Sequence, residues 1–125
     1  MIRIVTAAVD DMFFASKIRE TAKALGMIVN FPRGKDVLLD TIKQDIPHLI
    51  VVDLHTRKLN AFELAMELKA DEKLKPIPLL GFYSHVETET QRQALQAGYD
   101  EVLPRSLFFR ELANILAGES WKKSP

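Results

Sequence analysis

The sequence contains no cysteine, and this absence excludes disulfide frameworks, thiolate zinc sites and cysteine nucleophiles. No apolar run approaches the ~18 residues that a membrane-spanning helix requires. Neither sign of charge dominates, because 17 basic residues balance 17 acidic ones. A neutral chain without a basic stripe argues against general nucleic-acid binding, which depends on clustered Lys and Arg. We therefore expect no membrane span and no nucleic-acid partner, with a reducing, cytoplasmic setting as the default.

Several motifs that would indicate cofactor binding or hydrolysis are also missing. The segment TAAVDDMFF after the first apolar run has neither a G-x-G-x-x-G dinucleotide signature nor a phosphate loop of the flavodoxin kind. No serine lies in a G-x-S-x-G turn, so hydrolase chemistry has no support. The N-terminal MIRIVTAAV, interrupted by Arg3, is typical of a strand and not of a signal peptide.

The 125 residues suit one domain, and a hydrophobic content of 47% allows a substantial core. Five short apolar runs are nearly continuous, which is typical of central strands covered on both faces. The predicted strands are 2–9, 27–31, 49–52, 79–83 and 101–103. We expect the domain to cover residues 1–117, and the tail GESWKKSP (118–125) to be a frayed end or a linker stub.

Apolar residues between these runs recur at helical spacing and predict five helices. Gly26 is expected to end the first helix and Gly98 to follow the fourth. Capping-box spacings place Asn60 with Glu63 and Ser84 with Glu87 at two helix starts. The residues at this helical spacing are Phe14, Ile18, Ala22 and Leu25 in the first helix, Val37, Leu38, Thr41 and Ile42 in the second, Ala61, Leu64, Ala65 and Leu68 in the third, and Phe108, Leu112, Ile115 and Leu116 in the fifth.

This strict alternation predicts an α/β fold, a flavodoxin-like doubly wound five-stranded parallel sheet of order 2-1-3-4-5. In such sheets, sites form outside the carboxyl ends of the strands where the strand order reverses, here between the first and third strands. Asp10 and Asp11 follow the first strand and Asp53 follows the third. We therefore expect three carboxylates in one small region.

Clustered carboxylates raise one another's pKa unless a cation neutralises them, and Mg²⁺ suits such a site. Asp10, Asp11 and Asp53 could thus support metal-assisted phosphoryl transfer onto an aspartate. The alternatives are structural. Asp10 or Asp11 could simply cap the first helix, and Asp53 could be an ordinary loop acid.

Over about residues 2–117 the chain resembles the receiver domains of two-component response regulators. An acidic pair follows the first strand in those domains, as Asp10 and Asp11 do here, and PHLIVVDLHTRKLNAFEL matches the segment around their phosphoacceptor. The resemblance makes Asp53 the acceptor and places Ala61 where a Gly usually falls. It implies Mg²⁺ held by Asp10 or Asp11, by Asp53 and by the backbone carbonyl of His55.

Two positions depart from the receiver pattern. Receivers usually end the fourth strand with Thr or Ser, where this chain has Tyr83, with Ser84 one residue later as a possible switch hydroxyl. Because a one-residue shift reverses a side chain's direction in a strand, Ser84 is not an equivalent replacement. Receivers place Lys after the fifth strand, where Arg105 stands here as a candidate phosphate contact, and Val102 replaces the usual aromatic residue.

The resemblance implies a signalling module and not an enzyme. A histidine kinase or phosphotransfer protein would supply the phosphoryl group, and a downstream protein partner would read the result. A pseudo-receiver that binds partners without phosphorylation is the first alternative. A cobalamin- or flavin-binding domain is the second, because Asp53 to Lys58 partly match a D-x-H-x-x-G signature.

We expect a monomer or weak homodimer. The adjacent Met12, Phe13 and Phe14 predict at least one surface-exposed large apolar residue, either packed beside the site or part of a docking surface.

Overall fold

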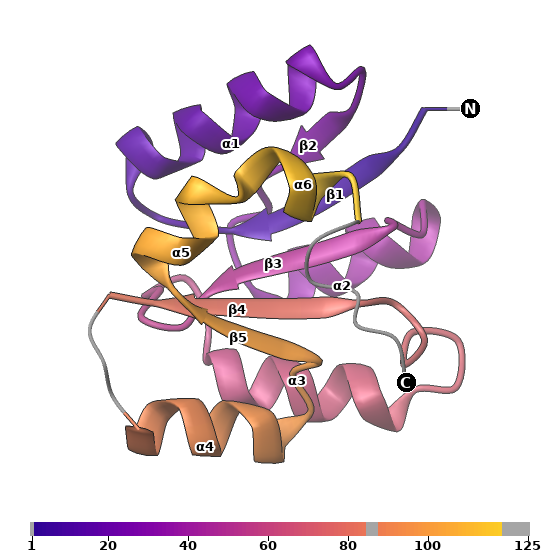
Figure 1. Cartoon of the computed structure of the whole chain (residues 1–125). Coiled ribbons are helices and arrows are strands. Elements are labelled where there is room, and N and C mark those ends of the chain that lie inside the picture. The colour runs from indigo at the N-terminus through magenta and orange to yellow at the C-terminus, as the bar shows by residue number, and fades with distance from the viewer. Residues whose placement is uncertain (1, 85–87, 119–125) are drawn as a thin grey trace.

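The strands form one parallel sheet whose order is β2-β1-β3-β4-β5. The computed structural model of the protein describes residues 2–84 and 88–118 (Figure 1). The strands are β1 (Ile4–Ala8), β2 (Ile28–Asn30), β3 (Leu49–Asp53), β4 (Leu79–Tyr83) and β5 (Glu101–Pro104). Both the predicted flavodoxin-like order and the parallel pairing are confirmed.

Helices cover both faces of this sheet. They are α1 (Met12–Ala24), α2 (Lys35–Gln44), α3 (Ala61–Ala70), α4 (Thr88–Ala97), α5 (Arg105–Arg110) and α6 (Leu112–Leu116). Figure 1 shows α1, α5 and α6 on one side and α3 and α4 on the other. The buried side chains accordingly form two clusters, one beneath α1, α5 and α6 and one beneath α2, α3 and α4. Within residues 2–84 and 88–118, no helix has the length and apolar character needed to cross a membrane.

The last helix differs from the prediction, because the continuous fifth helix is divided into α5 and α6 at Glu111. Glu111 has φ −102° and ψ 18°, outside the helical region, although its backbone N–H still donates to the Leu107 carbonyl at 3.0 Å. The predicted core positions of this segment are nevertheless all buried. Six helices are thus present in the described part of the chain, where five were predicted.

Helix ends follow the capping signals in part. Gly26, at φ 73°, ends α1 as predicted. The Asn60 side chain caps α3 by accepting from the N–H groups of Phe62 and Glu63, both at 3.0 Å. Glu63 itself pairs with Lys35 of α2 at 2.6 Å, so its carboxylate faces the neighbouring helix. Helix α4 begins at Thr88, and the predicted capping partner Glu87 lies outside the described residues.

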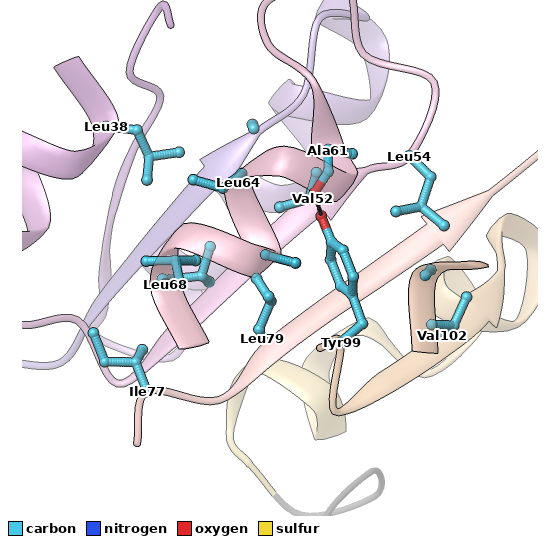
Figure 2. Close-up of a cluster of buried hydrophobic side chains, with 14 of the residues drawn as sticks. Leu38, Val52, Leu54, Ala61, Leu64, Leu68, Ile77, Leu79, Tyr99 and Val102 are labelled. Atoms are coloured by element: carbon cyan, nitrogen blue, oxygen red, sulfur yellow. Dashed lines mark hydrogen bonds between the residues drawn. The ribbon is translucent and has the colours of Figure 1, made fainter. Parts of the chain in front are cut away.

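The side chain of Tyr99, two residues before β5, crosses the core to the start of α3 (Figure 2). Its buried hydroxyl donates to the Ala61 carbonyl at 2.9 Å. The ring passes over Gly81 in β4, where an added Cβ would lie 3.1 Å from the ring and 2.9 Å from a Leu54 methyl. Glycine at position 81 is therefore required by a close approach.

We expect Gly81→Ala to lower the free energy of unfolding by about 1–3 kcal/mol, the usual cost of overpacking a core. Leu54 can move aside, but the hydrogen bond of Tyr99 holds its ring in place. Gly34→Ser is the matched control, since the position has space and serine is a favoured N-cap. Urea denaturation measures both variants. Equal stability of Gly81→Ala and the wild type would contradict this packing.

Candidate functional site at the carboxyl ends of the strands

The adjacent ends of β1 and β3 bring the predicted acids together. Ala8 pairs with Val52, so Asp53 ends β3 beside the point where the chain leaves β1 toward Asp10. Asp53 follows Val51 by two residues, which directs its side chain to the α1 face of the sheet. The arrangement is the one expected where the order of a doubly wound sheet reverses.

The Asp53 carboxylate is partly buried and only partly compensated. Burial raises its pKa above the ordinary value of 3.8, and the nearby negative charge of Asp10 acts in the same direction. The His55 N–H donates to Asp53 Oδ1 at 2.9 Å and, with the positive charge of Arg105, opposes this rise. Ionisation of Asp53 therefore costs free energy in the folded protein.

The Asp11 side chain caps the start of α1. Its Oδ1 accepts from the N–H groups of Phe13 and Phe14 at 2.9 and 3.1 Å. The helix-capping alternative is thus confirmed for Asp11, while its role as a metal ligand stays a prediction. Among the described residues, no group of three or more His, Asp or Glu side chains is arranged to hold a metal ion.

Asp10 connects the loop after β1 to the loop after β3. It accepts from the Thr56 hydroxyl through Oδ1 and from the Arg57 N–H, at 2.7 Å, through Oδ2. On the same loop, Lys58 donates from Nζ to the carbonyl of Val9 at 3.2 Å. Thr56 and Lys58 are not predicted as site residues from the sequence, because the only signal for them is their position three and five residues after Asp53.

Arg105, at the start of α5, lies over an aromatic ring. The carbon of its guanidinium is 4.7 Å from the centre of the Phe14 ring, which stacks on Phe109 with 4.8 Å between ring centres. No salt bridge joins Arg105 to Asp53 in the part of the chain that the structure describes. Arg105 thus acts on Asp53 through space while its side chain packs against α1. The neighbouring Met12 and Phe13 are exposed, as predicted for this segment.

The two hydroxyl candidates at the end of β4 lie in different surroundings. Tyr83 is buried in the cluster beneath α2, α3 and α4, which also contains Val102. Phe82, the residue paired with Asp53, belongs to the opposite cluster. Tyr83 therefore packs on the other face of the sheet from Asp53, since neighbouring strand residues point in opposite directions. Ser84 is half-buried directly after the strand, and its switch role stays a prediction.

The residues at this edge fit a small divalent cation such as Mg²⁺. Positive charge beside Asp53 would offset the burial and the Asp10 charge that raise its pKa. A carboxylate offers about four acceptor positions, and the hydrogen bonds from Thr56 and Arg57 occupy two of those on Asp10. Mg²⁺ typically takes one or two protein carboxylates and keeps several waters, which matches the pair Asp10 and Asp53.

Comparisons with solved structures give a consistent result for the fold. A chemotaxis response regulator, CheY4 of Vibrio cholerae, superposes with a TM-score of 0.81 at 16% identity, covering 94% of this chain and 98% of that one. The chain has the fold of a response-regulator receiver domain. The Mn²⁺-bound response regulator Rcp1 gives 0.80 at 16% identity, covering 98% and 99%, and the phosphorylated cyanobacterial phytochrome regulator RcpA gives 0.77 at 19%, covering 94% and 91%. No family model and no curated protein sequence matches the chain.

We expect Asp53→Asn to make this receiver-like domain more stable at neutral pH, because asparagine removes the partly buried charge and keeps an acceptor for the His55 N–H. The folded-state pKa of Asp53 lies above the unfolded value, so the cost of ionisation is fully present above the folded pKa. The difference between the variant and the wild type should shrink as the pH falls through the folded pKa, and disappear below about 3.8.

Urea denaturation at a series of pH values measures this difference. The matched control is Asp40→Asn, an exposed acid on α2 far from the strand ends. A stability difference for Asp53→Asn that does not change with pH would contradict the burial of an ionised carboxylate.

Proposed function

We propose that the chain is a signalling receiver domain in which Asp53 accepts a phosphoryl group from a phosphohistidine donor with Mg²⁺ bound beside it. The observation that carries the proposal is the partly buried carboxylate of Asp53 next to Asp10 at the strand ends, on a receiver fold. A histidine kinase or a phosphotransfer protein would be the donor. A downstream protein would bind differently to the two phosphorylation states.

The chemistry is a transfer between two nucleophiles. A carboxylate oxygen of Asp53 forms a bond to phosphorus while the bond from phosphorus to the donor's imidazole nitrogen breaks, and that nitrogen retains the electron pair. Asp10, Asp53 and the backbone carbonyl of His55 would hold the Mg²⁺, with Asp11 as a further candidate. When bound, the ion neutralises charge on the phosphoryl oxygens.

Arg105 and Ser84 would act on the phosphorylated state. A guanidinium can bind two phosphoryl oxygens at once, so a phosphoryl group on Asp53 would compete with the Phe14 ring for Arg105. The Ser84 hydroxyl would donate to a third oxygen. Movement of Arg105 away from α1 would then alter the surface formed by Phe14 and Phe109, which offers a route from the site to a partner.

A pseudo-receiver is the second candidate, and specific contacts favour it. Asp10 already accepts hydrogen bonds from the Thr56 hydroxyl and the Arg57 N–H. Lys58, on the same loop after β3, places a positive charge at the Val9 carbonyl, next to Asp10 in the chain. Tyr83, at the usual hydroxyl position, packs on the other face of the sheet. In this reading the protein binds partners through its surface without a phosphorylation cycle.

We expect acetyl phosphate with Mg²⁺ to give a single phosphoryl adduct in the intact mass of the wild type and none in Asp53→Asn. Asp10→Asn should slow adduct formation by about 10–100-fold, the range seen when groups that position a metal are removed. Asp40→Asn is the control and should react as the wild type does.

Beryllofluoride provides a second reading of the same site without covalent chemistry. Its binding should require Mg²⁺ and Asp53. The absence of any adduct, together with the absence of a Mg²⁺-dependent spectral change in the wild type, would overturn phosphoryl transfer in favour of the pseudo-receiver.

A further inference from the structure

A pocket of about 530 Å³ opens beside Asp10. It lies between α1, the segment that leads from β2 to α2, and the loop after β3. Its size falls in the range of small-molecule sites, about 300–1,000 Å³. The residues that give it chemical character are Asp10, Met12, Arg19, Phe31, Arg33 and Lys58.

The charge of this pocket favours an anion. Three cationic side chains, Arg19, Arg33 and Lys58, face one carboxylate, that of Asp10. Within residues 2–84 and 88–118, neither arginine forms a salt bridge. Asp10 is turned toward Thr56 and the Arg57 N–H, which lessens its repulsion of an anion. Two guanidinium groups therefore remain available for a phosphate, which they can bind in bidentate fashion.

The same pocket also presents apolar surface. Phe31 is half-buried, and the Arg19 guanidinium carbon lies 4.9 Å from its ring centre. Met12 is 85% exposed at the start of α1, although it is a flexible, polarisable side chain that packs well against flat rings. A ligand that placed a planar ring between these groups would bury surface that is otherwise in water.

We propose that this pocket binds a small phosphorylated molecule with a planar ring, of the nucleoside-phosphate class. Arg19 and Arg33 would bind the phosphate, and Met12 and Phe31 would contact the ring. The volume of the site, about 530 Å³, favours such a ligand over an extended peptide. The pocket shares Asp10 with the proposed Mg²⁺ site, but this binding does not require phosphorylation of Asp53 and would give the receiver-like domain a second input.

A ¹⁵N-labelled NMR titration with AMP tests the proposal, with ADP, adenosine and inorganic phosphate as comparison probes. The Asp53→Asn variant, without Mg²⁺, is titrated beside the wild type, so that the result does not depend on the acidic site. We expect saturable shifts of the Arg19, Phe31 and Arg33 amides with AMP and ADP. Adenosine and inorganic phosphate should each bind at least about tenfold more weakly, a loss of about 1.4 kcal/mol.

Two charge-reversal variants make the test specific. Arg33→Glu, at an exposed position without a salt bridge among the described residues, should weaken AMP binding by at least about tenfold. Lys17→Glu is the control, because it makes the same change of charge at a position on α1 outside the pocket, where Lys17 lies over the Phe13 ring. It should leave the affinity for AMP unchanged. Thermal unfolding of both variants checks that the fold is kept.

Three results would overturn the proposal. The first is the absence of saturable shifts at these amides up to about 10 mM AMP, beyond the millimolar limit of a useful site. The second is an Arg33→Glu affinity equal to that of the wild type. The third is a comparison probe that binds as tightly as AMP. Adenosine binding as tightly would show that the phosphate is not recognised, and inorganic phosphate binding as tightly would show that the ring is not recognised.

Discussion

The parallel pairing of β1 with β3 forces the carboxylates of Asp10 and Asp53 toward one edge of the sheet, and the surrounding contacts follow from that constraint. Burial and the neighbouring charge both disfavour ionised Asp53, as the rise in its pKa shows. The hydrogen bond that the His55 N–H donates to Asp53 and the positive charge of Arg105 reduce this cost without removing it. A site with residual negative charge of this kind favours a bound cation.

The positions of the nearby cationic side chains determine whether the negative charge of Asp53 is neutralised by an ion pair. Arg105 packs against Phe14, and Lys58 is bound to the Val9 carbonyl, so neither forms an ion pair with Asp53 among the described residues. Arg105 is nevertheless close enough for its charge to lower the pKa of Asp53. The arrangement leaves the Asp53 carboxylate partly exposed, while Tyr83 and Arg105 differ in identity from the residues that the receiver pattern has at these positions.

The sequence predicted the strand order and the location of Asp53 because nearly continuous apolar runs, alternating with amphipathic segments, allow few other topologies. It could not assign Asp10 and Asp11 to separate roles, since both suit a helix cap and only the path of the chain after β1 distinguishes them. The break at Glu111 was missed because the apolar spacing continues across it. The strand β2 is Ile28–Asn30, shorter than the predicted 27–31, because strand ends depend on pairing that the apolar pattern does not specify.

The most direct test of a cation-binding acceptor site is a Mg²⁺ titration of the ¹⁵N-labelled protein followed by NMR. The account predicts saturable shifts of the Asp10, Asp53 and His55 amides, lost in Asp53→Asn and kept in Asp40→Asn. Shifts that do not saturate, or that persist unchanged in Asp53→Asn, would contradict a metal site at Asp53.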